Sequence, residues 1–328
     1  SNTIGTTTYT WTNDTLGIGL SASGTGNIPV FTPINNTTSP IVATITVIPT
    51  FANGGKSCIG PSKVFTITIN PRGQVNNVSN IIVCNGETVP ALSFTTNNMG
   101  GTTIFNWVNN APSIGLMGSG TDTMPSFQAI NNGTTPITAS ITVTPQYTNS
   151  ITCSGSPLTY TIIVNPSAKV TTVTNKTVCN GTTLATINFA TSNTSGSTSY
   201  SWTNDTPSIG LGASGNGNIN AFAAINLGIS PIVATIQVTP SYTNNGITCS
   251  GLSTSFTITV NPTAQVNTIA NQILCNGTTT SAVTFTTNNT GGTTTYSWTN
   301  SNPAIGLALS GTGNINAFNV TNNTPSPI

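Results

Sequence analysis

Hydrophobic and polar residues alternate with a period of two along much of this chain. In residues 137–147 the apolar side chains fall on one face and the threonines and serine between them fall on the other. This alternation predicts a strand that is buried on one side. Residues 158–164 repeat the pattern after a Ser-Gly-Ser-Pro turn. Further short strands are expected near 75–83, 88–96, 102–108, 113–117 and 124–130. About seven strands separated by turn residues predict an immunoglobulin-like sandwich.

The whole pattern recurs about every 95 residues. An Ile-Gly-Leu triplet follows a tryptophan in each copy, and the four tryptophans are Trp11, Trp107, Trp202 and Trp298. We interpret them as core residues of the third strand rather than as a sugar-binding platform. Asn-Pro pairs end at Pro71, Pro166 and Pro262, where proline stops a strand ladder.

These pairs divide the chain into a partial first repeat (1–71), a second repeat (72–166), a third repeat (167–262) and a partial fourth repeat (263–328). The prediction is an all-β fold of tandem immunoglobulin-like β-sandwich modules of about 95 residues arranged in line. Because the chain opens and closes within a repeat, we interpret it as a piece of a longer protein.

Charge is scarce: 3% of residues are charged, the net charge is +1, and there is no histidine. A basic footprint for nucleic acid is therefore absent, as is a polybasic patch for anionic lipid. The longest apolar stretches are short and are broken by threonine, so no segment resembles the roughly 20 apolar residues of a membrane-spanning helix. Disorder is disfavoured, because 36% of residues are hydrophobic and they alternate regularly.

Catalytic chemistry is not expected in this chain. Without histidine, a Ser-His-Asp or Cys-His arrangement is impossible. The acids are spaced at about one per repeat, too sparsely for paired carboxylates; they are Asp14, Glu87, Asp122 and Asp205. The positions equivalent to Asp14 are Asn110, Asp205 and Ser301, so a recurring calcium site is also disfavoured. We predict no enzyme activity, no cofactor and no metal site.

The six cysteines form two families with regular spacing, which predicts disulfides in an extracellular chain. Cys84, Cys179 and Cys275 stand in Cys-Asn-Gly turns, whereas Cys58, Cys153 and Cys249 stand between the last two strands of their repeats. Pairing within a repeat, such as Cys84 with Cys153, conflicts with sandwich topology: one strand length, roughly 20–25 Å, separates those ends. Pairing across a junction, Cys84 with Cys249, avoids that conflict. We favour the second pairing, and the first stays open.

Three sequence features resemble the PKD-like repeats of Bacteroidetes surface proteins of the gliding-adhesin type. They are residues 200–211 (Tyr-Ser-Trp-Thr-Asn-Asp-Thr-Pro-Ser-Ile-Gly-Leu), Cys179-Asn180-Gly181 and Val260-Asn261-Pro262. The resemblance implies a long secreted protein exported by the type IX system to the bacterial cell surface. It also implies O-glycosylation where Asp precedes Thr and an apolar residue, which marks Thr15 and Thr123 as candidates; Pro207 breaks the motif after Thr206.

Three functions are compatible with these patterns. We favour a structural stalk or shaft of a cell-surface adhesin, whose partners are neighbouring repeats of the same chain and surface polysaccharide. A self-assembling extracellular filament, held together by unpaired sheet edges of neighbouring copies, is the second hypothesis. A carbohydrate-binding array is the third, and it requires exposed aromatic residues in a row. Nucleic acid and membrane insertion are not expected.

Overall fold

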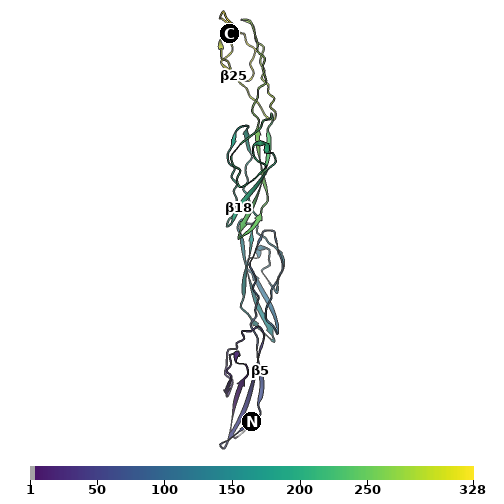
Figure 1. Ribbon diagram of the computed structural model, residues 1–328, viewed down its shortest axis with the longest axis vertical. Coiled ribbons are helices and arrows are strands. Elements are labelled where there is room, and N and C mark those ends of the chain that lie inside the picture. The colour runs from purple at the N-terminus through teal and green to yellow at the C-terminus, as the bar shows by residue number, and fades with distance from the viewer. Residues whose placement is uncertain (1–3) are drawn as a thin grey trace. The chain divides into compact units, whose positions relative to one another are not determined.

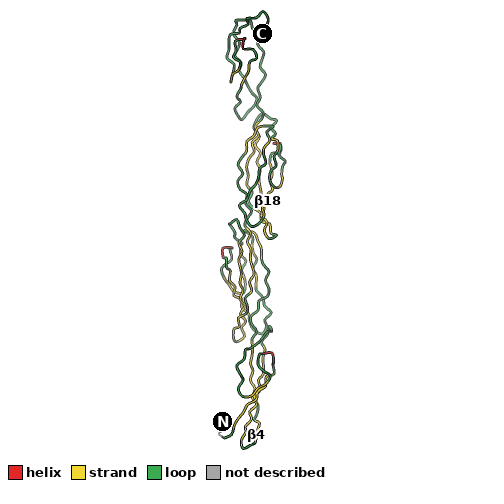
Figure 2. The backbone as a smooth tube through the Cα atoms, turned by 90° about the vertical axis from the view of Figure 1, so that its left-hand side faces the viewer, coloured by secondary structure: helices red, strands yellow, loops and turns green. Residues whose placement is uncertain are grey.

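Strands and single-turn 3-10 helices form the regular structure of residues 4–328, the part of the chain that the computed structural model describes. The residues form two compact units. Unit 1 comprises Ser1–Ser167 with Asn244–Cys249, and unit 2 comprises Ala168–Thr243 with Ser250–Ile328. Figure 1 draws the strands as arrows, and Figure 2 colours the strands differently from the loops. The predicted all-β fold of tandem sandwiches is confirmed.

The first repeat, in unit 1, contains one sheet built around a long strand. Its elements are β1 (Thr6–Asn13), η1 (Leu16–Ile18), β2 (Ser23–Thr25), β3 (Ile41–Asn53), β4 (Lys56–Ile59) and β5 (Lys63–Ile69). Strand β3 pairs antiparallel with β1, β4 and β5. Trp11, Ile18, Ala43 and Ile45 form the centre of a small core on this sheet.

The second repeat, also in unit 1, is a complete sandwich. Its larger sheet contains β6 (Ile81–Cys84), β9 (Thr102–Asn109), β10 (Ser119–Thr121), β13 (Ile137–Asn149), β14 (Ile151–Ser154) and β15 (Leu158–Asn165). Two short ladders pair β7 (Thr88–Val89) with β12 (Phe127–Gln128) and β8 (Leu92–Ser93) with β11 (Thr123–Met124). Residues of the ladders and of the larger sheet share one hydrophobic core. In β13, Ala139, Ile141 and Val143 are completely buried, as the alternation predicted.

The third repeat has the same architecture. Its elements are β16 (Lys176–Cys179), β17 (Thr183–Leu184), β18 (Ser197–Asn204), η3 (Pro207–Ile209), β19 (Ser214–Asn216), β20 (Phe222–Ala223), β21 (Ile232–Asn244), β22 (Ile247–Ser250) and β23 (Thr254–Asn261). The fourth repeat, in unit 2, contains β24 (Ser297–Thr299), η4 (Pro303–Ile305) and β25 (Ser310–Thr312). The repeat boundaries near Pro71, Pro166 and Pro262 stay predictions, although no strand crosses them.

The prediction of a strand at 113–117 was wrong. The segment contains a 3-10 turn, η2 (Pro112–Ile114), followed by Gly115 with φ of +96°. A left-handed residue turns the chain so that Ile114 and Leu116 both point into the core, at 0% and 1% exposure. A β-carbon on Gly115 would also collide with the Gln128 carbonyl. The alternation of buried and exposed residues at 114–116 is therefore produced by a turn and not by a strand. Glycine makes this turn possible because it adopts a positive φ without steric cost.

One glycine in each of the first three repeats packs against the tryptophan in that repeat. Gly24 lies in β2, and its equivalents Gly120 and Gly215 lie in β10 and β19. Each presses its Cα against the indole ring of its own repeat's tryptophan. Gly26, two residues after Gly24, has φ of +72° and lies in a turn.

Three of the four tryptophans are buried as the prediction of a core role requires. Trp11, Trp107 and Trp202 are 4%, 1% and 8% exposed. Trp298 is only half-buried. In the complete repeats the tryptophan strand pairs with a long strand, β13 or β21. The described part of the fourth repeat has no equivalent of that strand, so one side of Trp298 is uncovered.

Candidate functional site: the Cys84–Cys249 disulfide and its asparagine contacts

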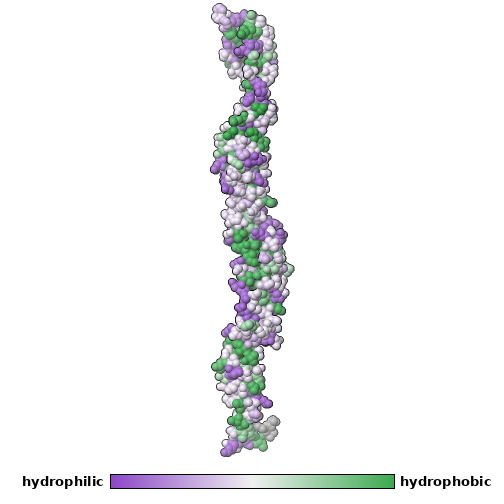
Figure 3. Space-filling view, turned by 45° about the vertical axis from the view of Figure 1, so that its right-hand side comes forward, coloured by the Kyte–Doolittle hydropathy of each residue, from purple (hydrophilic) through white to green (hydrophobic). Residues whose placement is uncertain are grey.

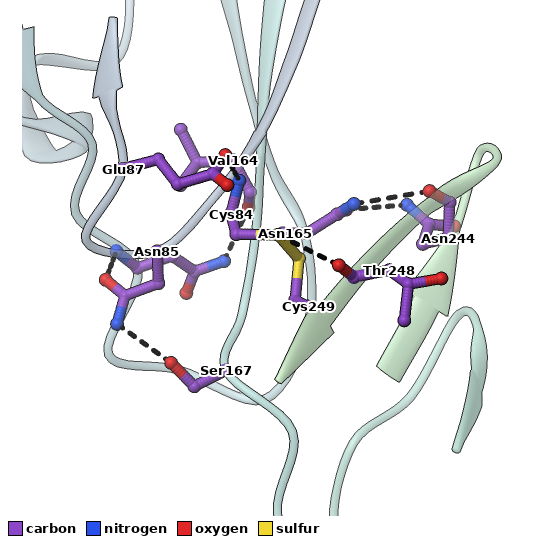
Figure 4. The surroundings of a disulfide bond; sticks show 10 residues. Cys84, Asn85, Glu87, Val164, Asn165, Ser167, Asn244, Thr248 and Cys249 are labelled. Atoms are coloured by element: carbon purple, nitrogen blue, oxygen red, sulfur yellow. Dashed lines mark hydrogen bonds between the residues drawn. A yellow bond between two sulfur atoms is a disulfide. The ribbon is translucent and has the colours of Figure 1, made fainter. Parts of the chain in front are cut away.

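A disulfide joins Cys84 to Cys249 across 165 residues of sequence, with the Cα atoms 5.5 Å apart. Both cysteines belong to unit 1, Cys84 at the end of β6 and Cys249 in β22. Cys249 is 2% exposed. Figure 4 shows the bond, with the Cys84 Sγ lying 3.7 Å from the Thr248 carbonyl oxygen. This pairing is the one favoured from the sequence, and it covalently joins the second and third repeats.

The Cys-Asn-Gly turn holds Cys84 in place through several hydrogen bonds. The Cys84 N–H donates to the Glu87 carboxylate at 2.9 Å. The Asn85 N–H donates to the Asn165 carbonyl, and its side-chain amide donates to the Ser167 hydroxyl at 3.1 Å. The Asn85 side-chain oxygen accepts the N–H of Asn131 at 2.7 Å. The turn therefore ties its own sandwich to the residues that follow the Asn-Pro pair.

Two parallel strands bring the cysteine and the boundary asparagine to the same end of the sheet. Strand β6 runs parallel to β15, and Cys84 stands opposite Asn165 in the register. Asn165 is completely buried. Its side-chain amide donates to the Asn244 carbonyl at 3.2 Å, and its side-chain oxygen accepts from the Asn244 amide at 2.9 Å (Figure 4). The segment 244–249 is therefore held by one covalent bond and one two-way amide contact.

The amide contact recurs between the first and second repeats inside unit 1. The Asn70 side chain donates to the Asn149 carbonyl at 2.6 Å, and the Asn149 amide donates back to the Asn70 side-chain oxygen at 3.3 Å. The backbone passes closely here, because a β-carbon on Gly155 would collide with the Gly73 carbonyl. The sequence predicted the Asn-Pro pairs as boundaries but missed this role of the asparagine. The recurrence of asparagine at positions 149 and 244, where the long strands end, was the available signal.

The asparagine of each Cys-Asn-Gly turn makes the same internal contact in three repeats. Asn85, Asn180 and Asn276 accept the backbone N–H of Asn131, Asn226 and Asn322, respectively. Asn131 and Asn226, each 1% exposed, donate in turn to the last apolar residue of the neighbouring strand, Val164 or Val260. These amides satisfy backbone groups that strand pairing leaves open.

The other four cysteines form no disulfide in the described part of the chain. Cys153 is half-buried, and Cys58, Cys179 and Cys275 are exposed. Cys153, the alternative partner of Cys84, stands in β14, where its carbonyl accepts the N–H of Gly73.

The four acids accept backbone hydrogen bonds in the sandwich framework. The Asp14 carboxylate accepts the Thr44 N–H at 2.7 Å, and Asp205 accepts the Thr235 N–H in the same way. These bonds hold the pKa of both carboxyls below the ordinary value, and the neighbouring Thr15 and Thr206 hydroxyls add to the effect. Asn110 accepts the Ser140 N–H at the equivalent position. A neutral amide therefore replaces the carboxylate in this structural role.

The two predicted glycosylation sites differ in setting. Thr15 precedes η1, and its hydroxyl donates to Asp14 at 2.9 Å. Thr123 is exposed and lies in strand β11. Its hydroxyl lies 3.3 Å from that of Ser93 on the paired strand β8. Asp122, at φ +59°, reverses the chain just before β11 and brings Thr123 onto this ladder. Glycosylation of both threonines stays a prediction.

Two features are absent from residues 4–328. No group of three or more His, Cys, Asp or Glu side chains comes together there. No helix in that range is long and apolar enough to cross a membrane.

No protein-family model and no curated protein sequence matches the chain. Among solved structures, three N-terminal domains of the bacteriophage RB49 Highly Immunogenic Outer Capsid protein (Hoc) match at 13% identity and TM-score 0.41, covering 78% of this chain and 88% of that one. Protocadherin Gamma B2 extracellular cadherin domains 3–6 match at 13% identity and TM-score 0.35, covering 98% and 86%. Similarity at this level assigns no function, and the fold stands on the sheets described above.

Proposed function

We propose that the chain is a shaft segment of a long secreted cell-surface adhesin, in which tandem sandwiches provide reach and resist tension. The observation that carries the proposal is the disulfide between the second and third repeats. A covalent bond at that position transmits force from one repeat to the next without passing through the 164 residues that separate the two cysteines, since their separation is 165.

The contacts around the disulfide support a mechanical role. Cys84 and Asn165 end adjacent parallel strands, and both hold the segment 244–249. Pulling on that segment loads β6 and β15 together. Shear along paired strands strains several hydrogen bonds at once, and β6 and β15 are paired over four positions.

The disulfide also supports an extracellular location, because disulfides persist in oxidising compartments. The surface is suited to that setting. Figure 3 shows a face dominated by pale residues of intermediate hydropathy, with hydrophobic and hydrophilic residues in scattered patches. Hydroxyl- and amide-rich strands of this kind are compatible with contact to surface polysaccharide. The resemblance to PKD-like repeats of Bacteroidetes adhesins supports export by the type IX system.

A carbohydrate-binding array has less support. Two aromatic side chains among residues 4–328 are strongly exposed, Tyr9 at 47% and Phe65 at 45%, and both belong to the first repeat. Equivalent positions in the second repeat are occupied by the buried Phe105 and Tyr160. A platform repeated along the chain would need exposed aromatics in every repeat.

Electron microscopy of the native protein, combined with antibody labelling of intact cells, tests the proposal. A shaft predicts single thin strands and labelling outside the cell envelope. Thick helical fibres formed by the purified protein would instead favour the self-assembling filament. Labelling confined to the cell interior would contradict both functions.

A further inference from the structure

The chain contains seven Asn-Gly sequences, each a potential site of spontaneous chemistry. The asparagines are Asn53, Asn85, Asn132, Asn180, Asn216, Asn245 and Asn276. In an Asn-Gly pair the glycine nitrogen can attack the side-chain carbonyl carbon of the asparagine, because glycine has no side chain to obstruct the approach. The attack needs a glycine N–H that is free to lose its proton and to move toward the side chain.

Five of the seven glycines have their N–H held in a hydrogen bond. Gly86, Gly181 and Gly277 donate to the carbonyls of Ala129, Ala224 and Val320 at 2.7–2.9 Å. Gly217 donates to the Tyr200 carbonyl at 2.9 Å, and Gly133 donates to the Asn131 side chain at 3.0 Å. In the Cys-Asn-Gly turns the attacked side chain is held as well, since its oxygen accepts a backbone N–H.

The remaining two pairs, Asn53-Gly54 and Asn245-Gly246, lie at hairpin tips. Asn53 ends β3 and Asn245 follows β21. Both asparagines are exposed. Within residues 4–328, the N–H groups of Gly54 and Gly246 make no hydrogen bond. Both glycines have positive φ, at +55° and +78°, in tight turns that project into solvent. Local opening of such a tip costs far less than opening a paired strand.

We propose that Asn53 and Asn245 are sites of spontaneous deamidation in the folded protein, and that the fold protects the other five asparagines. The glycine nitrogen forms a bond to the side-chain carbon, ammonia leaves, and a five-membered succinimide results. Water then opens the ring on either side, giving aspartate or isoaspartate. The step needs water alone and no oxidant or reductant.

The position of Asn245 gives this modification a consequence. Asn245 directly follows Asn244, whose amide pairs with Asn165, and it lies four residues before Cys249. Isoaspartate adds one backbone atom to the turn, and either product adds a negative charge. The modification therefore weakens the amide contact on Asn165 while the disulfide keeps the segment attached.

Peptide mapping by mass spectrometry of the oxidised protein, aged at about pH 8, tests the proposal. Conversion at Asn53 and Asn245 is expected to be at least about tenfold faster than at Asn85 and Asn180. This factor corresponds to the free energy of the one glycine N–H hydrogen bond that must break before Asn85 or Asn180 can react. The second repeat supplies a matched control, because the hairpin tip that follows β13 contains Asn149-Ser150 in place of an Asn-Gly pair. Asn149 should therefore stay unmodified.

The same protein unfolded in denaturant with the disulfide reduced provides the second arm. There, all seven Asn-Gly pairs should convert at similar rates. Equal conversion of Asn85 and Asn245 in the folded protein would overturn the proposal. So would intact tips in the folded protein over a time in which the unfolded chain converts.

Discussion

Asn165 and Asn244 exchange two amide hydrogen bonds although they lie 79 residues apart in sequence (Figure 4). Asn70 and Asn149 form the same pair at the same separation. One partner is always the asparagine of an Asn-Pro pair, and the other ends a long strand in the next repeat. The Asn-Pro pair thus ends a strand through its proline and holds the next repeat through its asparagine.

Replacing Asn165 by alanine is expected to lower the free energy of unfolding by about 1–3 kcal/mol. The substitution removes both hydrogen bonds between this side chain and half-buried Asn244, and polar groups that lose their partners away from water carry that cost. Chemical denaturation measures the change. Asn27 is exposed and makes no side-chain hydrogen bond, so N27A is the matched control. Equal stability of N165A and N27A would show that the amide pair contributes nothing.

Replacing Gly120 by alanine is expected to destabilise the second repeat by about 1–3 kcal/mol through overpacking. A β-carbon at this position would lie 2.5 Å from Cζ2 of Trp107, which is itself 1% exposed. Gly118 stands two residues away, and a β-carbon there would lie 3.6 Å from its nearest neighbour. G118A should therefore be nearly neutral. Thermal unfolding followed by tryptophan fluorescence compares the two variants, and equal melting temperatures would refute the packing argument.

The alternation of β-branched and polar residues predicted the long strands well, because β13 buries one face and leaves the other partly exposed. It failed at Ile114-Gly115-Leu116, where a left-handed glycine produces the same spacing of buried residues as a strand. The cysteine spacing favoured Cys84–Cys249 because β-sandwich topology limits which ends can meet. The amide contacts were not predictable, since asparagine is frequent in this chain and only the fold selects those that pair.

Acid is expected to destabilise the first and third repeats through Asp14 and Asp205. Hydrogen bonds from the Thr44 and Thr235 backbones lower the pKa of these carboxyls below 3.8. A depressed pKa contributes stability above the unfolded value and loses it as pH falls through the folded value. Denaturation midpoints between neutral pH and about pH 2 should therefore decline less steeply in D14N and D205N than in the parent protein.

The second repeat provides the reciprocal test, because Asn110 already occupies the equivalent position and accepts the Ser140 N–H. The N110D substitution should introduce the acid sensitivity that D14N removes. Identical acid profiles for N110D and the parent protein would contradict the role assigned to these carboxylates.

O-linked sugar is expected on Thr15 and Thr123 of the native protein, and not on Thr206. All three follow an aspartate, and the hydroxyls of Thr15 and Thr206 donate to that aspartate in the same way. Pro207 alone breaks the Asp-Thr-apolar motif in the third repeat, which makes Thr206 a matched control. Mass spectrometry of intact peptides from secreted protein measures occupancy. Bare peptides at both Thr15 and Thr123 would contradict the prediction.

Breaking the disulfide by the C84S substitution is expected to change both stability and mechanics. Closing a loop of this length contributes about 5 kcal/mol in the chain-entropy model, so C84S should unfold at a markedly lower denaturant concentration. Non-reducing peptide mapping of the parent protein should recover Cys84 joined to Cys249, and a Cys84–Cys153 peptide would refute the pairing. C179S is the matched control, because Cys179 ends the equivalent strand β16 without forming a bond in this chain.

Single-molecule stretching from the two termini tests whether the same bond carries load. While the disulfide is intact, the residues between Cys84 and Cys249 cannot extend. C84S should release them and lengthen the fully unfolded chain by about 560 Å, at about 3.4 Å for each residue. Reduction of the parent protein should give the same gain, and C179S should give none. If oxidised parent protein and C84S reached the same final length, the disulfide would be absent from the path of force, and the shaft proposal would lose the observation on which it rests.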